Sequence, residues 1–348
     1  MANNCTLFLD KQHYCTVIYA VKQTVSSLEL IGSLFVIFII WLFKTYKYFH
    51  QRLILALSVA ALCGSISFML TGVPQERGPL CELQAWFITY FVLALLFWVC
   101  CITFNIWRAL RGDRAKRLEK LYHFVSWGVP VIFASAPFSE NVYGPAGPWC
   151  WVAGDVEKSA IWRFATCKLI YGAADSFSPF FIRYYIPLFI CIIGLFVAYI
   201  YIFVTHRRQV QRWEGIHRMN NAADVEQRRV LMNHINSLMA YPFIYLVLSL
   251  APFIHRVYNA VYSDPSFVLI LLHVISIPLT GLINAIAFGV NKETLNRLNW
   301  ADMKVAFQQH FPSWNQGMDR SMGEHQLGEP TQCTEFPGRS NTRSNTIK

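Results

Sequence analysis

Seven long apolar stretches constrain this chain more than any other feature. They run over about 28–43, 53–73, 80–107, 122–137, 180–204, 235–257 and 267–290. A membrane-spanning helix needs about 20 apolar residues to cross a hydrocarbon core of roughly 30 Å. With 55% hydrophobic and 14% charged residues, the chain is also too apolar for an ordinary soluble domain. The sequence therefore predicts an all-α membrane protein, a bundle of seven transmembrane helices.

The basic residues between these stretches predict the orientation of the bundle. The first, third and fifth loops hold three, six and six Lys or Arg residues, whereas the second, fourth and sixth hold one, three and none. Positively charged loops stay on the cytoplasmic side of a membrane. We therefore expect the N-terminus outside and the C-terminus inside, in a multi-pass protein of the plasma membrane. The net charge of +10 is explained by these loops, and no nucleic-acid partner is expected.

The chain divides into four expected segments. These are an extracellular N-terminal segment 1–24, a seven-transmembrane domain 25–291, a juxtamembrane helix 292–307, and a disordered cytoplasmic tail 308–348 rich in polar residues. The N-terminal segment contains Asn4-Cys5-Thr6, a glycosylation acceptor triplet. Such triplets also arise by chance, so Asn4 is a candidate glycosylation site only if this end lies outside.

Two of the ten cysteines are placed to pair across the outer surface. Cys81 precedes the third apolar stretch, and Cys150 lies in the longest outer loop, so both would face an oxidising compartment. We expect a disulfide between them that ties the loop over the mouth of the bundle. The alternative is an unpaired loop thiol. Cys15 is open to pairing with Cys5 or with Cys167, and the spacing does not select between them.

The sequence shows no pattern typical of catalysis. It contains no zinc-spaced His pair, no Gly-rich phosphate loop and no Gly-x-Ser-x-Gly turn, so we expect no enzyme, no cofactor and no metal site. Few ionisable residues fall at mid-membrane depth, which argues against a proton relay or an ion pore. These features indicate a signalling receptor. The alternatives are a seven-span transporter or trafficking protein without G-protein coupling and, last, a membrane-embedded enzyme.

Three motifs carry a resemblance to a known family. They are Glu119-Lys120-x-Tyr122, Ser126-Trp127-Gly128-Val129-Pro130 and Trp149-Cys150-Trp151-Val152. They resemble the cyclic-AMP-receptor-like G protein-coupled receptors of slime moulds, a group with fungal members and an animal orphan receptor, and more distantly the secretin and adhesion receptors. The resemblance covers about 81–291. It implies an extracellular small ligand and a heterotrimeric G protein as partners, and cyclic AMP as a ligand through the group name alone.

Ligand-binding candidates lie near the expected outer ends of the helices. They are Arg183, Arg256, Glu29 and Trp151. If the two arginines point into the bundle, they favour an anionic or strongly polar small ligand, because guanidinium binds carboxylate and phosphate in a bidentate manner. The simpler explanation is that each cation reaches lipid headgroups or pairs with an acid. For Glu29, contact with the headgroups is the expectation we favour.

Candidates for G-protein coupling and for switching lie toward the inner side. The coupling candidates are Asn105, Arg108, Arg111, Arg117, Arg208 and Arg229. Contact with anionic lipid, at about 1 kcal/mol per basic residue, explains the same charges without a protein partner. The switch candidates are Pro252, Pro278 and Asn284, because a kinked helix can swing its inner end. Plain interhelical hydrogen bonding, worth about 0.6 kcal/mol on average, is the simpler role for Asn105 and Asn284.

Overall fold

The computed structural model describes residues 8, 12–70, 78–111, 118–141, 143–145, 149–152, 193–209, 222–261 and 266–310. Contacts divide the chain into two units, Met1–Asn299 and Trp300–Lys348. The first unit contains all of the long apolar helices, and the second contains one described helix, α11 (Trp300–His310). The expected glycosylation site at Asn4, the tail beyond 310 and most of the fifth expected span lie outside the described residues.

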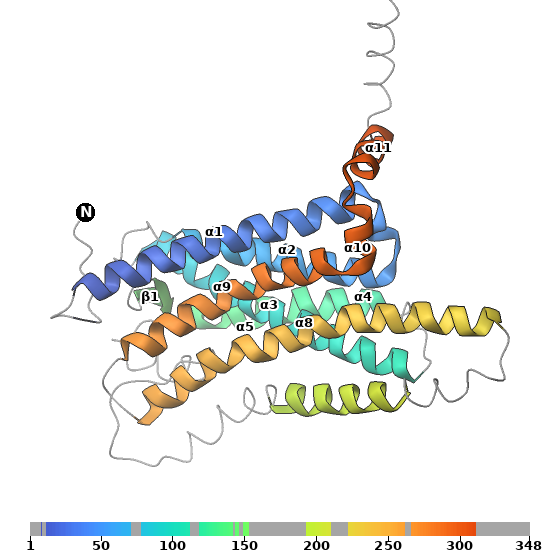
Figure 1. The fold of residues 1–348 in the computed structure, drawn as a ribbon. Coiled ribbons are helices and arrows are strands. Elements are labelled where there is room, and N and C mark those ends of the chain that lie inside the picture. The colour runs from blue at the N-terminus through green and yellow to red at the C-terminus, as the bar shows by residue number, and fades with distance from the viewer. Residues whose placement is uncertain are drawn as a thin grey trace, which may run out of the picture. The chain divides into compact units, whose positions relative to one another are not determined.

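The described part of the first unit is almost entirely helical (Figure 1). In chain order its elements are α1 (Gln12–Leu42), η1 (Thr45–Lys47), α2 (Phe49–Met69), α3 (Pro79–Leu110), α4 (Glu119–His123), η3 (Phe124–Gly128), α5 (Val129–Ser135), η4 (Ala136–Glu140), β1 (Tyr143–Pro145), β2 (Cys150–Val152), a helix over 193–209, α8 (Ala222–Val261), α9 (Phe267–Val290) and α10 (Lys292–Arg297). The two short strands pair antiparallel, with Gly144 opposite Trp151.

Six helices within the described ranges are long and apolar enough to cross a membrane. They cover His13–Leu42, Phe49–Met69, Pro79–Leu110, Glu119–Phe138, Ile235–His255 and Phe267–Val290. These six correspond to the expected spans one to four, six and seven. Of the expected fifth span over 180–204, only the part from 193 onward is described, and it is helical. The protein is thus a helical multi-pass membrane protein.

The helix that contains the first expected span begins well before that span. We expected the span to start near Leu28, whereas α1 begins at Gln12. The polar residues that seemed to end the span lie instead along one face of α1, at positions 22, 26, 29 and 33, and all four are at most 2% exposed. Residues three or four apart share one face of a helix. Because α1 packs along α2 and α9, this face points into the bundle (Figure 1).

The main core consists of buried residues from α1, α2, α3, α8 and α9, together with Tyr122 of α4 and two residues of the helix over 193–209. Trp98 of α3 is fully buried, and its ring meets the edge of Trp127 at a centroid distance of 5.9 Å. The turn that contains Trp127, η3, is a π-helical turn just before Pro130. A proline removes a backbone donor and crowds the preceding turn, and π turns widen a helix locally. Tyr90 of α3 donates to the carbonyl of Trp127 at 3.2 Å, which joins the two helices at this turn.

The expected juxtamembrane helix over 292–307 is divided in two. It consists of α10 and α11, with Leu298 and Asn299 between them. Leu298 packs against the main core, whereas α11, the described part of the second unit, has no buried residue.

Candidate functional site

The end of the bundle that carries strands β1 and β2 is called here the hairpin end. At this end Cys81, in the first turn of α3, forms a disulfide with Cys150 at the start of β2, with a Cα–Cα distance of 5.2 Å. Gln84 of α3 reinforces the junction, because its Oε1 accepts from the backbone N–H of Cys150 at 3.4 Å. Tyr143 of β1 is buried and donates to the carbonyl of Ala134 at 2.8 Å. The hairpin is therefore held to both α3 and α5.

A cavity of about 210 Å³ lies next to this hairpin. Its walls come from α1, α2, α3, α8 and α9 and from the residues around β2, and most of them are apolar or aromatic. The lining consists of Lys22, Phe68, Ile88, Thr89, Val92, Leu93, Leu95, Leu96, Trp149, Trp151, Tyr245, Leu248, Ser249, Pro252, Phe253, His273, Val274, Ser276, Ile277 and Thr280. A single water needs about 10–15 Å³ of such space, so the cavity has room for a small organic molecule.

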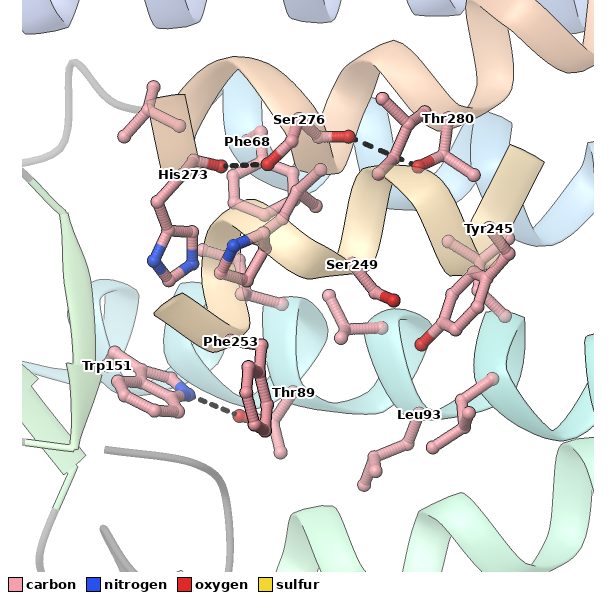
Figure 2. Close-up of a pocket in the computed structure, with 18 of the residues that line it drawn as sticks. Phe68, Thr89, Leu93, Trp151, Tyr245, Ser249, Phe253, His273, Ser276 and Thr280 are labelled. Carbon is pink, nitrogen blue, oxygen red and sulfur yellow. Dashed lines mark hydrogen bonds between the residues drawn. The ribbon is translucent and has the colours of Figure 1, made fainter. Parts of the chain in front are cut away.

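Trp151 links the hairpin to the cavity wall. Its Nε1 donates to Oγ1 of Thr89 on α3 at 3.0 Å, as Figure 2 shows. The same Thr89 hydroxyl donates to the carbonyl of Ala85 one turn earlier, at 2.8 Å. Trp151 is 7% exposed and packs with the disulfide in a small cluster of buried residues. The indole ring is thus fixed at the boundary between the hairpin and the cavity.

The other serine and threonine hydroxyls of the described lining donate their hydrogens within their own helices. Ser249 of α8 donates to the carbonyl of Leu246 at 2.9 Å. Ser276 and Thr280 of α9 donate to the carbonyls of His273 and Ser276, at 3.0 and 3.2 Å (Figure 2). A hydroxyl whose hydrogen is already donated can still accept a hydrogen bond. These groups therefore offer a ligand acceptor oxygens.

Two buried histidines join α8 to α9 beside the cavity. The Nδ1 atoms of His255 and His273 lie 2.8 Å apart, and the two side chains are 6% and 5% exposed. At this distance one imidazole donates its N–H to the other. Pro252, a switch candidate, lines the cavity one turn before His255, and the candidate Pro278 is buried in α9.

Lys22 is the one cationic side chain among the cavity residues that the structure describes. It belongs to α1 and is only 1% exposed. Its Nζ lies 5.2 Å from the ring centre of Phe68 and 5.0 Å from that of Trp149. Within the described part of the chain, this Nζ has no hydrogen-bond partner. The sequence analysis did not single out Lys22, although the spacing of the polar residues of α1 contained the signal.

The four ligand-binding candidates have different outcomes. Trp151 lines the cavity. The expectation that Glu29 reaches the headgroups is wrong, because its side chain is 2% exposed and lies between α1 and α9 against Gly281. Glu29 is also absent from the cavity lining. Arg183 lies outside the described residues. For Arg256, the structure describes the backbone in α8 but not the side chain.

At the opposite end, where α3 ends and α4 begins, the structure describes part of the expected coupling surface. Arg108 lies in the last turn of α3, and the guanidinium of Arg111 lies 4.1 Å from the ring centre of Trp107. Arg208 is exposed on the helix over 193–209. That helix contacts α3 here, since Gln209 donates to the carbonyl of Leu110 at 2.9 Å. Arg117 and the side chain of Arg229 fall outside the described residues.

Two buried amides lie inside the bundle. Asn105 of α3 and Asn284 of α9 are each 5% exposed, and the Oδ1 atom of each has no partner among the described residues. A buried acceptor without a partner costs about 1–3 kcal/mol. A different arrangement of the helices that supplied a hydrogen-bond donor to either Oδ1 atom would therefore be favoured at that position.

Arg52 of α2 joins the short helix η1 to Glu119 of α4. Arg52 binds the Glu119 carboxylate through two nitrogens, with Nη2 donating to Oε2 at 2.7 Å. Its Nη1 donates to the carbonyls of Lys47 and Tyr46 at 3.0 and 3.3 Å. A bidentate arginine fixes both distance and orientation. The pair gives a structural role to Glu119, one of the residues that carry the family resemblance.

The described ranges contain no cluster of three His, Cys, Asp or Glu residues that could hold a metal ion.

Cys15 is disulfide-bonded, and its partner lies outside the described ranges.

Comparisons with known proteins agree with this architecture. A family model described as slime mold cyclic AMP receptor matches residues 10–320. Cyclic AMP receptor-like protein A of Dictyostelium discoideum is 24% identical over 78% of this chain and 63% of its own length. G-protein coupled receptor 1 of Arabidopsis thaliana is 24% identical over 79% of this chain and 78% of its own length. G-protein coupled receptor 157 of Homo sapiens is 31% identical over 34% of this chain and 39% of its own length.

Proposed function

The chain belongs to the slime mold cyclic AMP receptor family, and we propose that it is a G protein-coupled receptor for a small extracellular ligand. In this proposal the ligand enters the cavity beneath the hairpin, and the opposite end of the bundle engages a heterotrimeric G protein. The protein is then a seven-span receptor of the plasma membrane with no catalytic activity of its own. The relatives named as receptors support this class of function.

The observation that carries the proposal is the position of the cavity. It lies beside a hairpin that a disulfide ties to α3, and its walls include α3, α8 and α9. Ligand sites are typically concave and largely apolar, with a few polar groups that orient the ligand. The described cavity has this composition and room for more than solvent.

The same helices offer a route from the cavity to the opposite end. A ligand shifts a conformational equilibrium only through different affinities for the two states. Helix α8 contains Pro242 and Pro252 and α9 contains Pro278, so both are helices that can bend about internal points. Beyond the cavity the two helices are joined again, because Asn291 donates to Ser237 at 2.8 Å. We propose that ligand binding moves these helices and changes the surroundings of Asn105 and Asn284.

The orientation is part of the proposal and has a direct test. With the hairpin end outside, a tag at residue 2 is reached by antibody on intact cells, and a tag at residue 348 only after permeabilisation. The distribution of basic residues and the disulfide at the hairpin end support this arrangement. The reverse labelling pattern would contradict it.

A ligand screen followed by a signalling assay tests the receptor function. The purified protein is screened by thermal shift against cyclic nucleotides, sugars and lipids, because a true ligand raises the melting temperature by mass action. Each hit is then tested for ligand-dependent nucleotide exchange on a G protein. We expect at least one hit to stimulate exchange. Ligand-dependent uptake of a labelled hit into vesicles, without exchange, would favour a transporter instead.

A matched pair of substitutions locates the effect in the cavity. Val92 of α3 lines the cavity, so Val92→Trp should fill part of it and abolish the response. Val247 of α8 is 48% exposed and absent from the lining, so Val247→Trp should leave the response unchanged. If the two variants respond alike, the ligand acts elsewhere.

The inner surface is tested by charge reversal. Replacing Arg111 and Arg117 with Glu should abolish coupling while surface expression stays intact. The double replacement with Lys keeps the charge and is the matched control. Unchanged coupling in the Glu variant would favour contact with anionic lipid as the role of these arginines.

A further inference from the structure

The cavity has an unusual distribution of polar groups. Around an apolar and aromatic interior, its described lining has one long cationic side chain, Lys22, whose Nζ has no hydrogen-bond partner among the described residues. Removing a charged group from water without a partner is costly, and buried charges are normally paired. The aromatic rings of Phe68 and Trp149 offset only a small part of this cost, since each such contact contributes about 0.5–2 kcal/mol. An anion beside Nζ would stabilise the charged form of Lys22.

The described acids do not supply that anion. Glu29 shares the buried face of α1 but lies seven residues further along, roughly 10 Å along the helix axis. Its carboxylate packs against Gly281 and does not line the cavity. Other acidic residues, such as Asp10, Glu76, Asp155, Glu157, Asp175 and Asp264, lie outside the described residues, and the test includes their pairing with Lys22 as an outcome.

The rest of the cavity limits what the anion can be. The lining consists mainly of hydrocarbon and ring surface, and its Ser and Thr hydroxyls already donate within their helices. A ligand with many hydroxyl groups, such as a sugar, would leave most of its own acceptors unpaired here. A polyanion would face one cation only among the described lining residues. A single acid group on an apolar or aromatic body fits both constraints.

We propose that Lys22 binds the acid group of a monoanionic, otherwise apolar ligand whose body lies along α3, α8 and α9. The acid contacts Nζ between Phe68 and Trp149, and the body fills the space toward Ser249 and Tyr245. This inference rests on the cavity of the proposed function and specifies its ligand class. It is separate from the expected anion site at Arg183 and Arg256, whose side chains lie outside the described residues and which stays a prediction.

Matched acid and amide probes test the proposal. The full-length protein, purified in detergent, is assayed by thermal shift and equilibrium binding with 2-naphthoate, decanoate and benzoate, and with the amide of each. We expect at least one acid to bind at least tenfold more tightly than its amide. Lys22→Met should abolish that preference, and Lys22→Arg should retain it. Val92→Trp should weaken both members of the pair.

The melting temperature without probe separates a binding role from a structural one. If Lys22 lacks a partner in the free protein, Lys22→Met should raise the melting temperature, because a buried charge is replaced by an apolar side chain of similar length. If one of these acids pairs with Lys22, Lys22→Met should lower it. Replacing that acid by its amide, with Asp10, Glu76, Asp155, Glu157, Asp175 and Asp264 tested in turn, should then lower it as well, and this result would overturn the proposal.

The remaining outcomes are also decisive. Equal affinity for acid and amide, or binding that Lys22→Met leaves unchanged, would remove Lys22 as the anchor while leaving the receptor function intact. Binding by none of the probes would overturn the ligand class. Acid binding that depends on Lys22 but never stimulates nucleotide exchange with any G protein would confirm the anion site and refute the proposed function.

Discussion

The close approach of α1 and α9 makes a sharp prediction about stability. A methyl group added at Gly281 would lie 2.6 Å from Oε1 of Glu29 and 2.7 Å from its Cγ. Glu29 is 2% exposed, so its side chain has no open space into which it can rotate. Because Cγ is involved as well as the carboxylate, a small movement of the side-chain tip does not relieve the overlap. Gly281→Ala must therefore displace α1 or force Glu29 into a strained rotamer.

The cost follows from overpacking. Added carbon atoms in a well-packed interior typically cost about 1–3 kcal/mol, and we expect about 2 kcal/mol of lost unfolding free energy. For a domain of 150–250 residues, 1 kcal/mol shifts the melting temperature by roughly 2–4 °C. Gly281→Ala should then lower it by roughly 4–8 °C, measured by tryptophan fluorescence during thermal unfolding in detergent.

Gly289, two turns further along the same helix, supplies the matched control. A methyl group there would lie 3.6 Å from Cε1 of Phe35, which is ordinary van der Waals contact. Alanine also favours a helix over glycine by up to about 1 kcal/mol, so Gly289→Ala should leave the melting temperature unchanged or raise it. Adding Glu29→Ala to Gly281→Ala removes the overlapping atoms, and the two changes should be non-additive by at least about 1 kcal/mol. Additive effects, or equal melting temperatures for the two glycine variants, would refute the close-packing argument.

Three further predictions concern contacts at the two ends of the bundle. Cys150→Ser should lower the unfolding free energy by up to about 4 kcal/mol, because the disulfide joins residues 69 positions apart; non-reducing peptide mapping that finds both thiols free in the wild type would contradict this. Trp151→Phe removes the donor to the Thr89 hydroxyl of α3 and should lower the unfolding free energy by about 1 kcal/mol. Equal melting temperatures for the variant and the wild type would contradict this. Arg52→Ala should cost at most about 1 kcal/mol, since its side chain is 32% exposed, and Glu119→Ala should add little to it; additive losses would show that the pair contributes nothing as a pair.

The sequence predicted the long helices well because the requirement for a membrane span is local. About 20 consecutive apolar residues are enough to indicate one, and α9 begins and ends at the residues expected, Phe267 and Val290. The family was also accessible from the sequence, because the motifs around Glu119, Ser126 and Trp149 are contiguous. The family match over residues 10–320 confirms that resemblance.

The first long helix begins earlier than the apolar stretch for a physical reason. Average hydropathy treats all faces of a helix alike, so buried polar residues look like the end of a span. Lys22, Ser26, Glu29 and Ser33 are tolerated because they face other helices, and the residues on the lipid side of α1, such as Ile31 at 63% exposure, remain apolar. The spacing of the four polar residues, three or four positions apart, was the signal that could have revealed an interior face.

The amino-acid sequence alone was thus enough to predict a helical membrane protein, most of its helices and its family, because each of these depends on residues that are neighbours along the chain. The candidate ligand site depends on residues that are not neighbours. Lys22, Phe68 and Trp149 come from three segments of the chain, and they meet only because α1 and α2 pack together and the disulfide brings the residues around β2 onto α3. Whether a buried lysine faces lipid, an acid or an open cavity is set by that packing, since no local pattern specifies what the neighbouring helices present to it.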